Sequence, residues 1–570
     1  MRIAIFSLTG KGVHAIWIGM YVRTISRKNK DGSITTYVQL AHNAWDPKAG
    51  HAKAQVLYTF GRADSLDLEA IRRLIKSLCR FLSPEEALQT QASLGKESPA
   101  LRFLKSLPQG GAFVLRALWE RLELHHVLAQ SLREREFQSP VEWAIFAMVA
   151  NRALAPDSKR GVEEWVREDV ALGNPAPISL QHLYRAMDFL RGQKEQVQKE
   201  VFFSTADLLN LEVDLLFFDT TSTYVERDEE DEEGLRRYGY SRDNRPDLPQ
   251  VVIGLAVTKE GIPVRCWVLP GNTQDMTTVE KVKKDLSGWK LSRCVWVMDR
   301  GMNSDQNRAI LQQAGGHYIL GEKLRDNQAI HQEALCGGGQ FHKVRDNLQV
   351  KEVLVGQVER RRRFVLVYNP EQAKKDKARR EQLLQRIAKA LGSLGGPRKD
   401  FQKAVRKLLA HGKMGPYLRQ LKSGKLKINR MKVRAEEALD GKYLLSTSDD
   451  SLSPEDVALG YKQLLEVERA FRTLKTTLDL RPLYHWKDER IEAHVFLCFL
   501  ALLLVRIAER QTGQTWDRIR AVLERIHLGE FFSRDGRILQ RTELTPDQIK
   551  LLKLLDIHSP EKIQRVEIHA

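Results

Sequence analysis

Three acidic residues stand where a chain could build a metal-dependent catalytic site. Asp219 follows the apolar run LLFF, and Asp299 follows the apolar run VWVM. An acid directly after a buried strand lies at the rim of a sheet, where open α/β sheets place their sites. Glu468 lies in the helical pattern YKQLLEVERAFRTLK. Taken singly, each aspartate is as well explained by a turn or helix cap, and Glu468 by an ordinary exposed helix face.

The three acids together predict one kind of chemistry. Three carboxylates can hold two Mg²⁺ ions, which prefer oxygen ligands. Two such ions, ~3.5–4 Å apart, activate a water or a 3′-hydroxyl and stabilise the leaving oxygen in phosphodiester displacement. Clustered acids repel one another when no cation is bound, so a site of this kind requires metal.

The elements that must position these acids follow from hydrophobic patterning. We expect strands at 213–221, 294–300, 316–324, 363–369 and 442–448, and two strands within 251–272. Residues 276–289, 370–394 and 453–480 have the three- and four-residue apolar spacing of helices. Within the last helix Tyr461, Glu468 and Lys475 are seven residues apart, nearly two turns each, and we expect them on one face.

The flanking regions have a different pattern. Residues 20–60 are rich in β-branched and aromatic residues and predict strands, whereas residues 65–205 predict a succession of helices. The apolar run Val495–Val505 has eleven residues, against ~20 for a membrane span, and predicts a buried core helix. Asp535-Gly536 predicts a hairpin near the C-terminus, and Thr545-Pro546 the start of a last helix.

Positive charge is concentrated in one segment. The chain has a net charge of +18, and residues 360–434 contain 24 Lys and Arg against 4 Asp and Glu, a net of +20, so the rest of the chain carries −2. Such runs are usually solvated helix surfaces. Twenty uncompensated charges favour contact with a polyanion instead, and we interpret this segment as nucleic-acid binding. The acidic run ERDEEDEE at 226–233 predicts a mobile, solvated loop.

Other residues argue for an intracellular protein without a structural metal. Five cysteines contain no C-x-x-C pair, which favours a reducing compartment and disfavours a zinc finger. Lys11 and His14 interrupt the apolar N-terminus, so we expect no signal peptide and a cytoplasmic, nucleoid-associated protein without membrane contact. We interpret His485 and His494 as core or DNA-facing residues, and Trp267 and Trp296 as core.

Several of these motifs resemble one family. FFDTTS, YGYSRDNRPDLPQVVIGL, LPGNTQD, VMDRGMNS and YKQLLEVERAFRTLK, followed by RPLYHWKDERIEAHVFLCFLAL, are similar to bacterial insertion-sequence transposases of the DDE group. The subgroup is that whose third acid lies in a Tyr-x2-Arg-x3-Glu-x6-Lys (YREK) signature. The motifs cover about 213–325 and 442–510, and the N-terminal third is more weakly family-like.

The resemblance implies an α/β fold with an RNase H-like mixed sheet flanked by helices, and an N-terminal β-plus-helical region. It implies Asp219, Asp299 and Glu468 as catalytic and metal-binding residues, with two Mg²⁺ ions, or Mn²⁺ as substitute. Tyr461 and Lys475 match the signature as DNA-binding positions. The signature Arg is replaced by Leu464, which cannot hold a phosphate, and Arg472 is our candidate substitute, with Arg469 as an alternative.

The implied domain organisation has six parts. They are a β-rich region at 1–64, a helical and DNA-binding region at 65–205, the two parts of the RNase H-like core at 206–325 and 441–515, a basic insertion domain at 326–440, and a C-terminal hairpin and helix at 516–570.

The function expected is that of a DNA transposase. It would bind the terminal inverted repeats of its element as a homodimer, cleave the ends and join them to target DNA. Two alternatives stay open: an RNase H-fold nuclease without strand transfer, and a catalytically inactive DNA-binding relic.

Overall fold

The computed structural model describes most of the chain. The described residues are 4–5, 16–17, 19–30, 32–78, 81, 102–133, 140–173, 177–209, 213–289, 291, 294–325, 328–356, 361–394, 398–533 and 536–568. The chain forms two compact units, residues 1–102 with 533–536 and 569–570, and residues 103–532 with 537–568. Each unit is described by itself.

The first unit contains a three-stranded antiparallel sheet. Its strands are β3 (Met20–Lys28), β4 (Ile34–Asp46) and β5 (His51–Arg62), in the order β3-β4-β5, followed by helix α1 (Leu68–Leu78). Gly32, at φ +86°, closes the turn between β3 and β4, where few residues other than glycine fit. Two short strands, β1 (Ala4–Ile5) and β2 (Ile16–Trp17), pair with each other. The strands predicted within 20–60 are confirmed.

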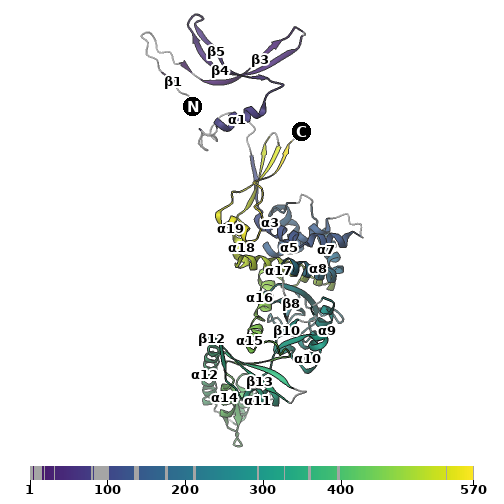
Figure 1. The fold of residues 1–570 in the computed structure, drawn as a ribbon. Helices are drawn as coiled ribbons and strands as arrows, with labels where there is room; N and C mark the ends of the chain where they lie inside the picture. The colour runs from purple at the N-terminus through teal and green to yellow at the C-terminus, as the bar shows by residue number, and fades with distance from the viewer. Residues whose placement is uncertain are drawn as a thin grey trace. The chain divides into compact units, whose positions relative to one another are not determined.

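The second unit is built on a nine-stranded mixed sheet, the central sheet, in the order β12-β13-β14-β17-β11-β10-β7-β8-β9 (Figure 1). Strands β7, β10 and β11 run parallel to one another, and the other pairings are antiparallel. The bounds are β7 (Leu215–Tyr224), β8 (Gln250–Thr258), β9 (Pro263–Pro270), β10 (Val295–Met298), β11 (His317–Gly321), β12 (His342–Arg345), β13 (Leu348–Val355), β14 (Arg362–Tyr368) and β17 (Lys442–Thr447). All the strands predicted in this region are present.

Helices cover both faces of the central sheet. One face packs against α8 (Lys194–Leu208), α9 (Asp275–Leu286) and α10 (Asp305–Gln312), in a core that includes Trp267 and Trp296 as predicted. The other packs against α15 (Pro454–Lys462), α16 (Leu465–Arg472) and α17 (Asp488–Thr512). Because both faces are covered, the strands in the middle of the sheet include long apolar runs, such as VWVM in β10, and β8 is buried at every residue.

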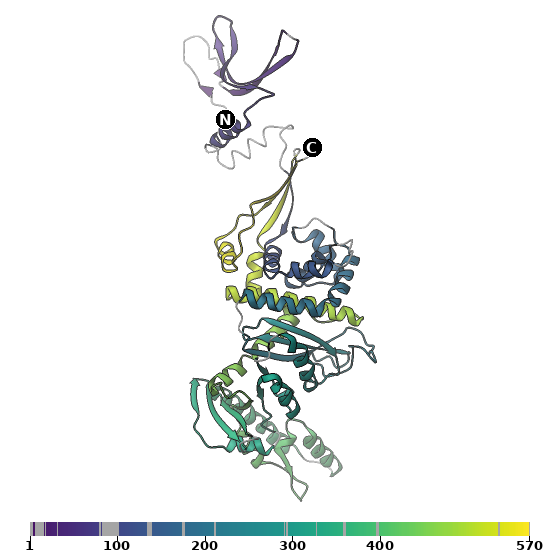
Figure 2. The same cartoon turned by 45° about the vertical axis from the view of Figure 1, so that its right-hand side comes forward.

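The region 103–209 is a helical bundle. Its helices are α3 (Gly110–Arg121), α4 (Leu124–Leu132), α5 (Val141–Leu154), α6 (Lys159–Glu168), α7 (Leu180–Gly192) and α8. Helix α17 lies between α5 and α7 on one side and the central sheet on the other (Figures 1 and 2). By length and composition α17 could cross a membrane, but 89% of its most apolar stretch is buried inside the protein. It is the core helix that the sequence predicts.

The C-terminal region contains the predicted hairpin strands β18 (His527–Ser533) and β19 (Gly536–Arg541), although residues 534–535 of the turn lie outside the described residues. Helix α19 (Pro546–Leu554) begins at a capping box formed by Thr545 and Gln548. One strand departs from the all-helical expectation for 65–205. Strand β6 (Arg102–Pro108) forms one sheet with β18, β19 and β20 (Ile563–Ile568). The local sequence does not predict this strand, because its partners come from the distant C-terminal region.

The basic segment is divided between two structures. Strand β14 pairs with β13 and β17, so the strands at 342–368 extend the central sheet, although the sequence analysis assigns them to an insertion. The helices α12 (Pro370–Gly392), α13 (Arg398–Ala410) and α14 (Arg430–Glu437) follow, with the hairpin β15–β16 (Leu418–Gln420 and Leu426–Ile428). Residues from α12, α13 and this hairpin share a small hydrophobic core of their own.

Two local expectations near the acids are wrong. The helix predicted over 453–480 is interrupted: Gln463 and Leu464 donate backbone hydrogen bonds three residues back, which breaks the α-helical register between α15 and α16. A π-helical turn, Thr473–Thr477, then follows α16. The strand carrying Asp219 does not end there, because the β-branched residues after it continue to pair with β8 as far as Tyr224.

The acidic run at 226–233 is solvated but anchored. Asp231 accepts hydrogen bonds from the backbone of Gly234, and Glu230 accepts one from the backbone of Tyr238. The hydroxyl of Tyr238 donates to the carbonyl of Asp228.

Candidate active site

Asp219 and Asp299 lie side by side on neighbouring parallel strands. Met298, the last residue of β10, pairs with Phe218 of β7, so the next residue on each strand is an aspartate. Strand β10 ends at this point while β7 continues, which opens the edge of the sheet beside Asp299. Asp219 and Asp299 are 80 residues apart in the sequence, and only the register between β7 and β10 makes them neighbours.

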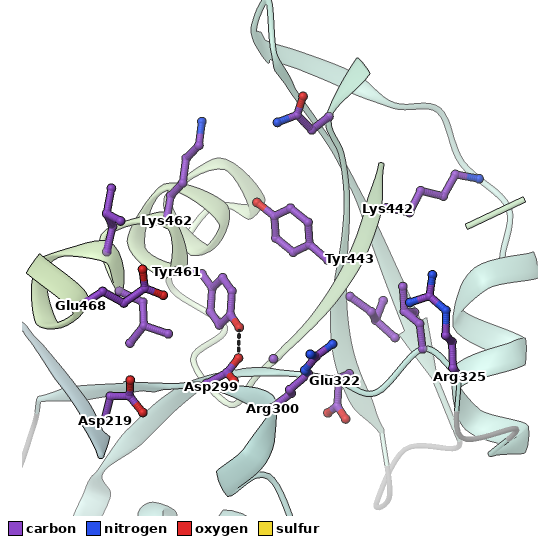
Figure 3. A pocket seen from close by; sticks show the side chains of 16 residues that line it. Asp219, Asp299, Arg300, Glu322, Arg325, Lys442, Tyr443, Tyr461, Lys462 and Glu468 are labelled. Atoms are coloured by element: carbon purple, nitrogen blue, oxygen red, sulfur yellow. Dashed lines mark hydrogen bonds between the residues drawn. The ribbon is translucent and has the colours of Figure 1, made fainter. Parts of the chain in front are cut away.

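Glu468 reaches the same place from α16. Asp219, Asp299 and Glu468 line one cavity of about 470 Å³, and Figure 3 shows their carboxylates directed toward it. Asp219 and Asp299 are partly buried, and Glu468 is exposed. The three predicted catalytic acids are therefore assembled from two strands and a helix that are far apart in the chain.

The environment of Asp219 disfavours its ionised form. Burial, together with the negative charges of Asp299 and Asp275, raises the pKa of Asp219 to about 7, against the opposing effects of the Thr220 amide and the Arg242 charge. The Asp219 carboxylate accepts a hydrogen bond from the Thr220 amide at 2.8 Å. Bringing a cation to this carboxylate would relieve the cost of its charge.

The donor set fits a divalent cation. Hard ions such as Mg²⁺ take carboxylate oxygens, and the Glu468 carboxylate has no hydrogen-bond or ion-pair partner among the described residues. Within the described ranges, no three His, Cys, Asp or Glu side chains are grouped so as to hold one ion together. The three acids thus line one cavity without converging on one point.

Tyr461, predicted as a DNA-binding residue, contacts Asp299. Its hydroxyl donates a hydrogen bond to Asp299 Oδ1 at 3.0 Å, and burial together with the Asp299 charge raises the pKa of Tyr461 above its usual range. The hydrogen bond depends on Gly321 having no side chain. Gly321 directly follows Leu320, which pairs with Met298 of β10. A Cβ atom at Gly321 would lie 2.5 Å from the Tyr461 hydroxyl.

Basic side chains line the same cavity as the acids. Its lining includes Arg300, Arg325, Lys442 and Lys462 (Figure 3). A cavity with carboxylates at one side and cations around them is suited to a phosphodiester, whose charge the cations offset while the acids hold metal. None of these four residues is predicted from the sequence. Only Arg300 has a local signal there, since it directly follows Asp299.

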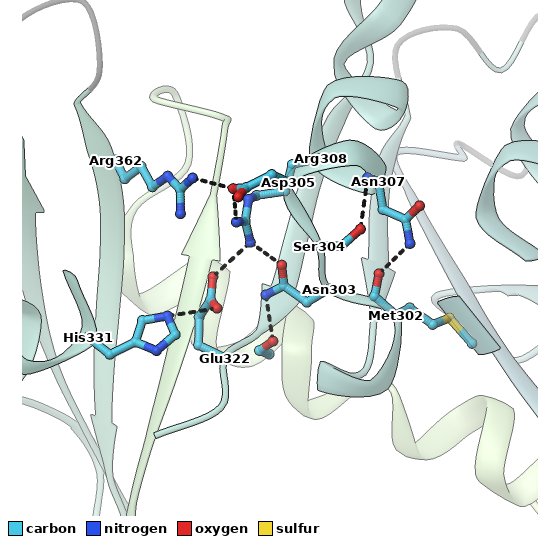
Figure 4. A network of polar contacts seen from close by, with 10 residues as sticks. Met302, Asn303, Ser304, Asp305, Asn307, Arg308, Glu322, His331 and Arg362 are labelled. Atoms are coloured by element: carbon cyan, nitrogen blue, oxygen red, sulfur yellow. Dashed lines mark hydrogen bonds and ion pairs between the residues drawn. The ribbon is translucent and has the colours of Figure 1, made fainter. Parts of the chain in front are cut away.

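A polar network holds the loop after Asp299 (Figure 4). Asn303 donates to the Gly321 carbonyl at 2.8 Å, and Arg308 is bound by Asn303 and Asp305. Arg308 also lies 3.5 Å from Glu322, a buried acid that is paired with His331 at 3.1 Å. The loop is thus fastened to the end of β11, which keeps Asp299 next to Gly321.

Two other predicted site residues, Lys475 and Arg472, are not among the residues that line the cavity. Lys475 is in the π-helical turn, where it pairs with Asp243. Arg472 is exposed at the end of α16. Leu464 is buried and lines the cavity beside Glu468, and Arg469 pairs with Glu466 at 2.6 Å.

His494 is buried and His485 is partly buried, and among the described residues neither belongs to a group of His, Cys, Asp and Glu that could hold a metal ion. Their rings are 5.5 Å apart. Burial, with the nearby charge of Lys159, lowers the pKa of His485 to about 4 and lowers that of His494 as well.

The family follows from the match of this region to a family model. Residues 214–504, which contain all three acids, match the transposase DDE domain. The chain belongs to the DDE transposases. Residues 22–90 match the N-terminal domain of IS1634 family transposases, so this is an insertion-sequence transposase. As such it acts on DNA, and its α/β catalytic domain is RNase H-like and dependent on a divalent metal.

Other comparisons add little to this. Among solved structures, one similar to the transposase is a cryo-EM structure of the piggyBac transposase synaptic complex with hairpin DNA. The two are 10% identical with a TM-score of 0.34, over 74% of this chain and 82% of that one. No curated protein matches the transposase.

Proposed function

We propose that the transposase cleaves the terminal inverted repeats of its own insertion sequence and joins the released 3′-hydroxyls to target DNA, using Asp219, Asp299 and Glu468 as its catalytic triad. The observation that carries this is the cavity that all three carboxylates line. The match of residues 214–504 to the transposase DDE domain supports the proposal, and so does the lining of this cavity, which combines Asp219, Asp299 and Glu468 with basic side chains.

The three acids would hold two Mg²⁺ ions, with Mn²⁺ as a substitute. Such ions supply Lewis acidity and lower the pKa of a bound water or hydroxyl. The other tasks belong to the chain itself. Arg300 and Lys462 border the cavity and can offset the charge of a bound phosphodiester, while Tyr461 fixes the orientation of Asp299. Positioning and electrostatics of this kind carry phosphoryl transfer.

The ends of the element would be bound by two copies of the chain, one at each end. The described part of the basic segment supports this DNA contact, since α12, α13 and the β15–β16 hairpin carry many of its Lys and Arg residues and share a small hydrophobic core of their own. Arg472, exposed beside the catalytic helix, is a further candidate DNA contact.

The test uses the complete transposase with a labelled DNA end from the inverted repeats that bracket its gene, a target plasmid and Mg²⁺. Cleavage and joined product, both lost in Asp299→Ala, are expected. The matched control is Asp517→Ala, an acid of α18 (Trp516–Leu523) that does not line the cavity. Cleavage without joining would support the nuclease alternative, and binding without cleavage would support an inactive relic.

A further inference from the structure

The loop of the motif YGYSRDN connects two of the elements that carry the catalytic acids. Arg242 donates to the backbone carbonyl and the hydroxyl of Thr220, the residue after Asp219, and pairs with Asp275 at 2.9 Å. Its backbone amide also donates to Ser222 Oγ at 2.9 Å. On this side the loop is therefore fixed to β7.

The next residue fixes the loop to the other element. Asp243, with a side chain only 4% exposed, accepts a hydrogen bond from Lys475 Nζ at 2.9 Å and a second from Arg481. Lys475 also donates to the Ser222 carbonyl of β7 at 2.7 Å. The π-helical turn that extends α16 is thus tied to β7 both directly and through Asp243.

These contacts leave Lys475 poorly placed to hold DNA. Its side chain is 11% exposed and is not among the residues lining the catalytic cavity. To reach a phosphate it would have to leave Asp243, a buried carboxylate whose loss of a partner is costly. Arg481 is 33% exposed, so of the two cations paired with Asp243 it is the more accessible.

We propose that Asp243 and Lys475 form a positioning pair, which sets the β7 strand carrying Asp219 against the α16 helix carrying Glu468, and that Lys475 does not contact DNA. The proposal rests on the proposed function, because it takes these two acids as catalytic. Lys475 lies seven residues after Glu468 in the sequence. It then acts through Asp243 and sets the distance between the carboxylates of Asp219 and Glu468.

The pair can be tested because its two members carry opposite charges. A DNA-binding lysine and a neighbouring acid should affect DNA affinity in opposite directions, whereas the two halves of a brace should give the same defect. The variants are Asp243→Ala, Lys475→Met and the double variant, each in the complete transposase. Measurements are the affinity for a labelled end as a function of salt, cleavage rate, and the Mg²⁺ concentration at half-maximal cleavage.

We expect both single variants to cleave about 10–100-fold more slowly and to require more Mg²⁺, as when other supports of metal ligands are removed. The double variant should be no worse than either single one, since both remove the same interaction. End affinity should stay within about twofold, with an unchanged salt slope. Asp243→Asn, which keeps the side-chain size, carries the same expectation if Asp243→Ala does not fold.

The opposite result is equally definite. If Lys475→Met weakens end binding and lowers the salt slope by about one, while Asp243→Ala binds as well as or better than wild type, Lys475 is a DNA contact and the positioning pair is wrong. Failure of the proposed function would look different. In that case wild type itself would not cleave, or Asp299→Ala would cleave normally.

Discussion

The hydroxyl of Tyr461 lies 3.0 Å from Asp299 and donates a hydrogen bond to it. This relationship links α15 to the end of β10, and it gives Tyr461 a role in holding Asp299, one of the three acids that we propose as catalytic. A carboxylate binds metal ions more tightly when a neighbouring hydrogen-bonding group fixes its orientation.

Replacing Tyr461 by Phe tests this role. The variant keeps the ring and its packing but loses the hydrogen bond, so we expect the fold to be retained and cleavage to fall by about tenfold. The change should appear mainly as a higher Mg²⁺ requirement. Tyr443, which lines the same cavity but has no hydrogen bond to any of the three acids, provides the control as Tyr443→Phe. Equal defects in both variants would contradict the role of the Tyr461 hydroxyl.

Gly321→Ala should have a similar effect without touching Tyr461. The new Cβ atom would meet the tyrosine hydroxyl at 2.5 Å, so the hydroxyl must move and the hydrogen bond to Asp299 is weakened. Gly338, where a Cβ atom meets nothing within 4 Å, is the matched control. We expect reduced cleavage for Gly321→Ala and wild-type cleavage for Gly338→Ala. Combining Gly321→Ala with Tyr461→Phe should relieve the clash and give no further loss.

Divalent cations should stabilise the transposase in the absence of DNA. A ligand that binds only the folded state raises the free energy of unfolding by RT ln(1 + [L]/Kd), about 2.7 kcal/mol at one hundred times Kd. We expect Mg²⁺ and Mn²⁺ to raise Tm in a thermal melt, and the rise to be lost in Asp219→Asn. An equal rise in Asp219→Asn would place the ion elsewhere.

Stability should depend on pH through Lys159. This side chain is 4% exposed, and burial with the charge of Arg152 lowers its pKa to about 7. Between pH 7 and the ordinary lysine pKa the unfolded chain binds more protons than the folded one, so stability rises with pH, by at most about 1.4 kcal/mol per unit.

Urea unfolding of wild type and Lys159→Met, followed from pH 7 to 9.5, measures this contribution. The other buried groups near Lys159 titrate outside that window, since the pKa of His485 is lowered to about 4 and that of Cys498 is raised to about 11. We expect the variant to be more stable at pH 7 and to have a flatter profile. Lys199→Met, at an exposed lysine, should keep the wild-type slope.

The basic segment should make DNA binding sensitive to salt. Each phosphate contact contributes about 0.9 to the slope of log affinity against log salt. Replacing Lys425 and Lys427, both exposed at the β15–β16 hairpin, by Gln should lower that slope by up to about 1.8. The same change at Lys550 and Lys553 of α19 should leave it unaltered. Equal salt slopes for the two double variants would show that the β15–β16 hairpin does not contact DNA.

Local patterns in the sequence determined much of this protein. The strands of the central sheet, the buried helix α17 and the chain positions of Asp219, Asp299 and Glu468 could all be predicted. Apolar periodicity reports on the burial of neighbouring residues, and an acid directly after such a run marks a strand end. Composition also located the basic segment, since charge is additive along the chain.

The tertiary structure decided how those pieces act together. The register of β7 with β10 sets Asp219 beside Asp299, and the break after α15 puts Tyr461, which contacts Asp299, on a different helix from Glu468. Asp243 and Lys475 are 232 residues apart in the sequence, and they are paired only because the fold brings the loop of Asp243 to Lys475. Such pairings depend on the packing of distant segments and on which cation competes best for a buried carboxylate. A local sequence pattern contains no information on either of these.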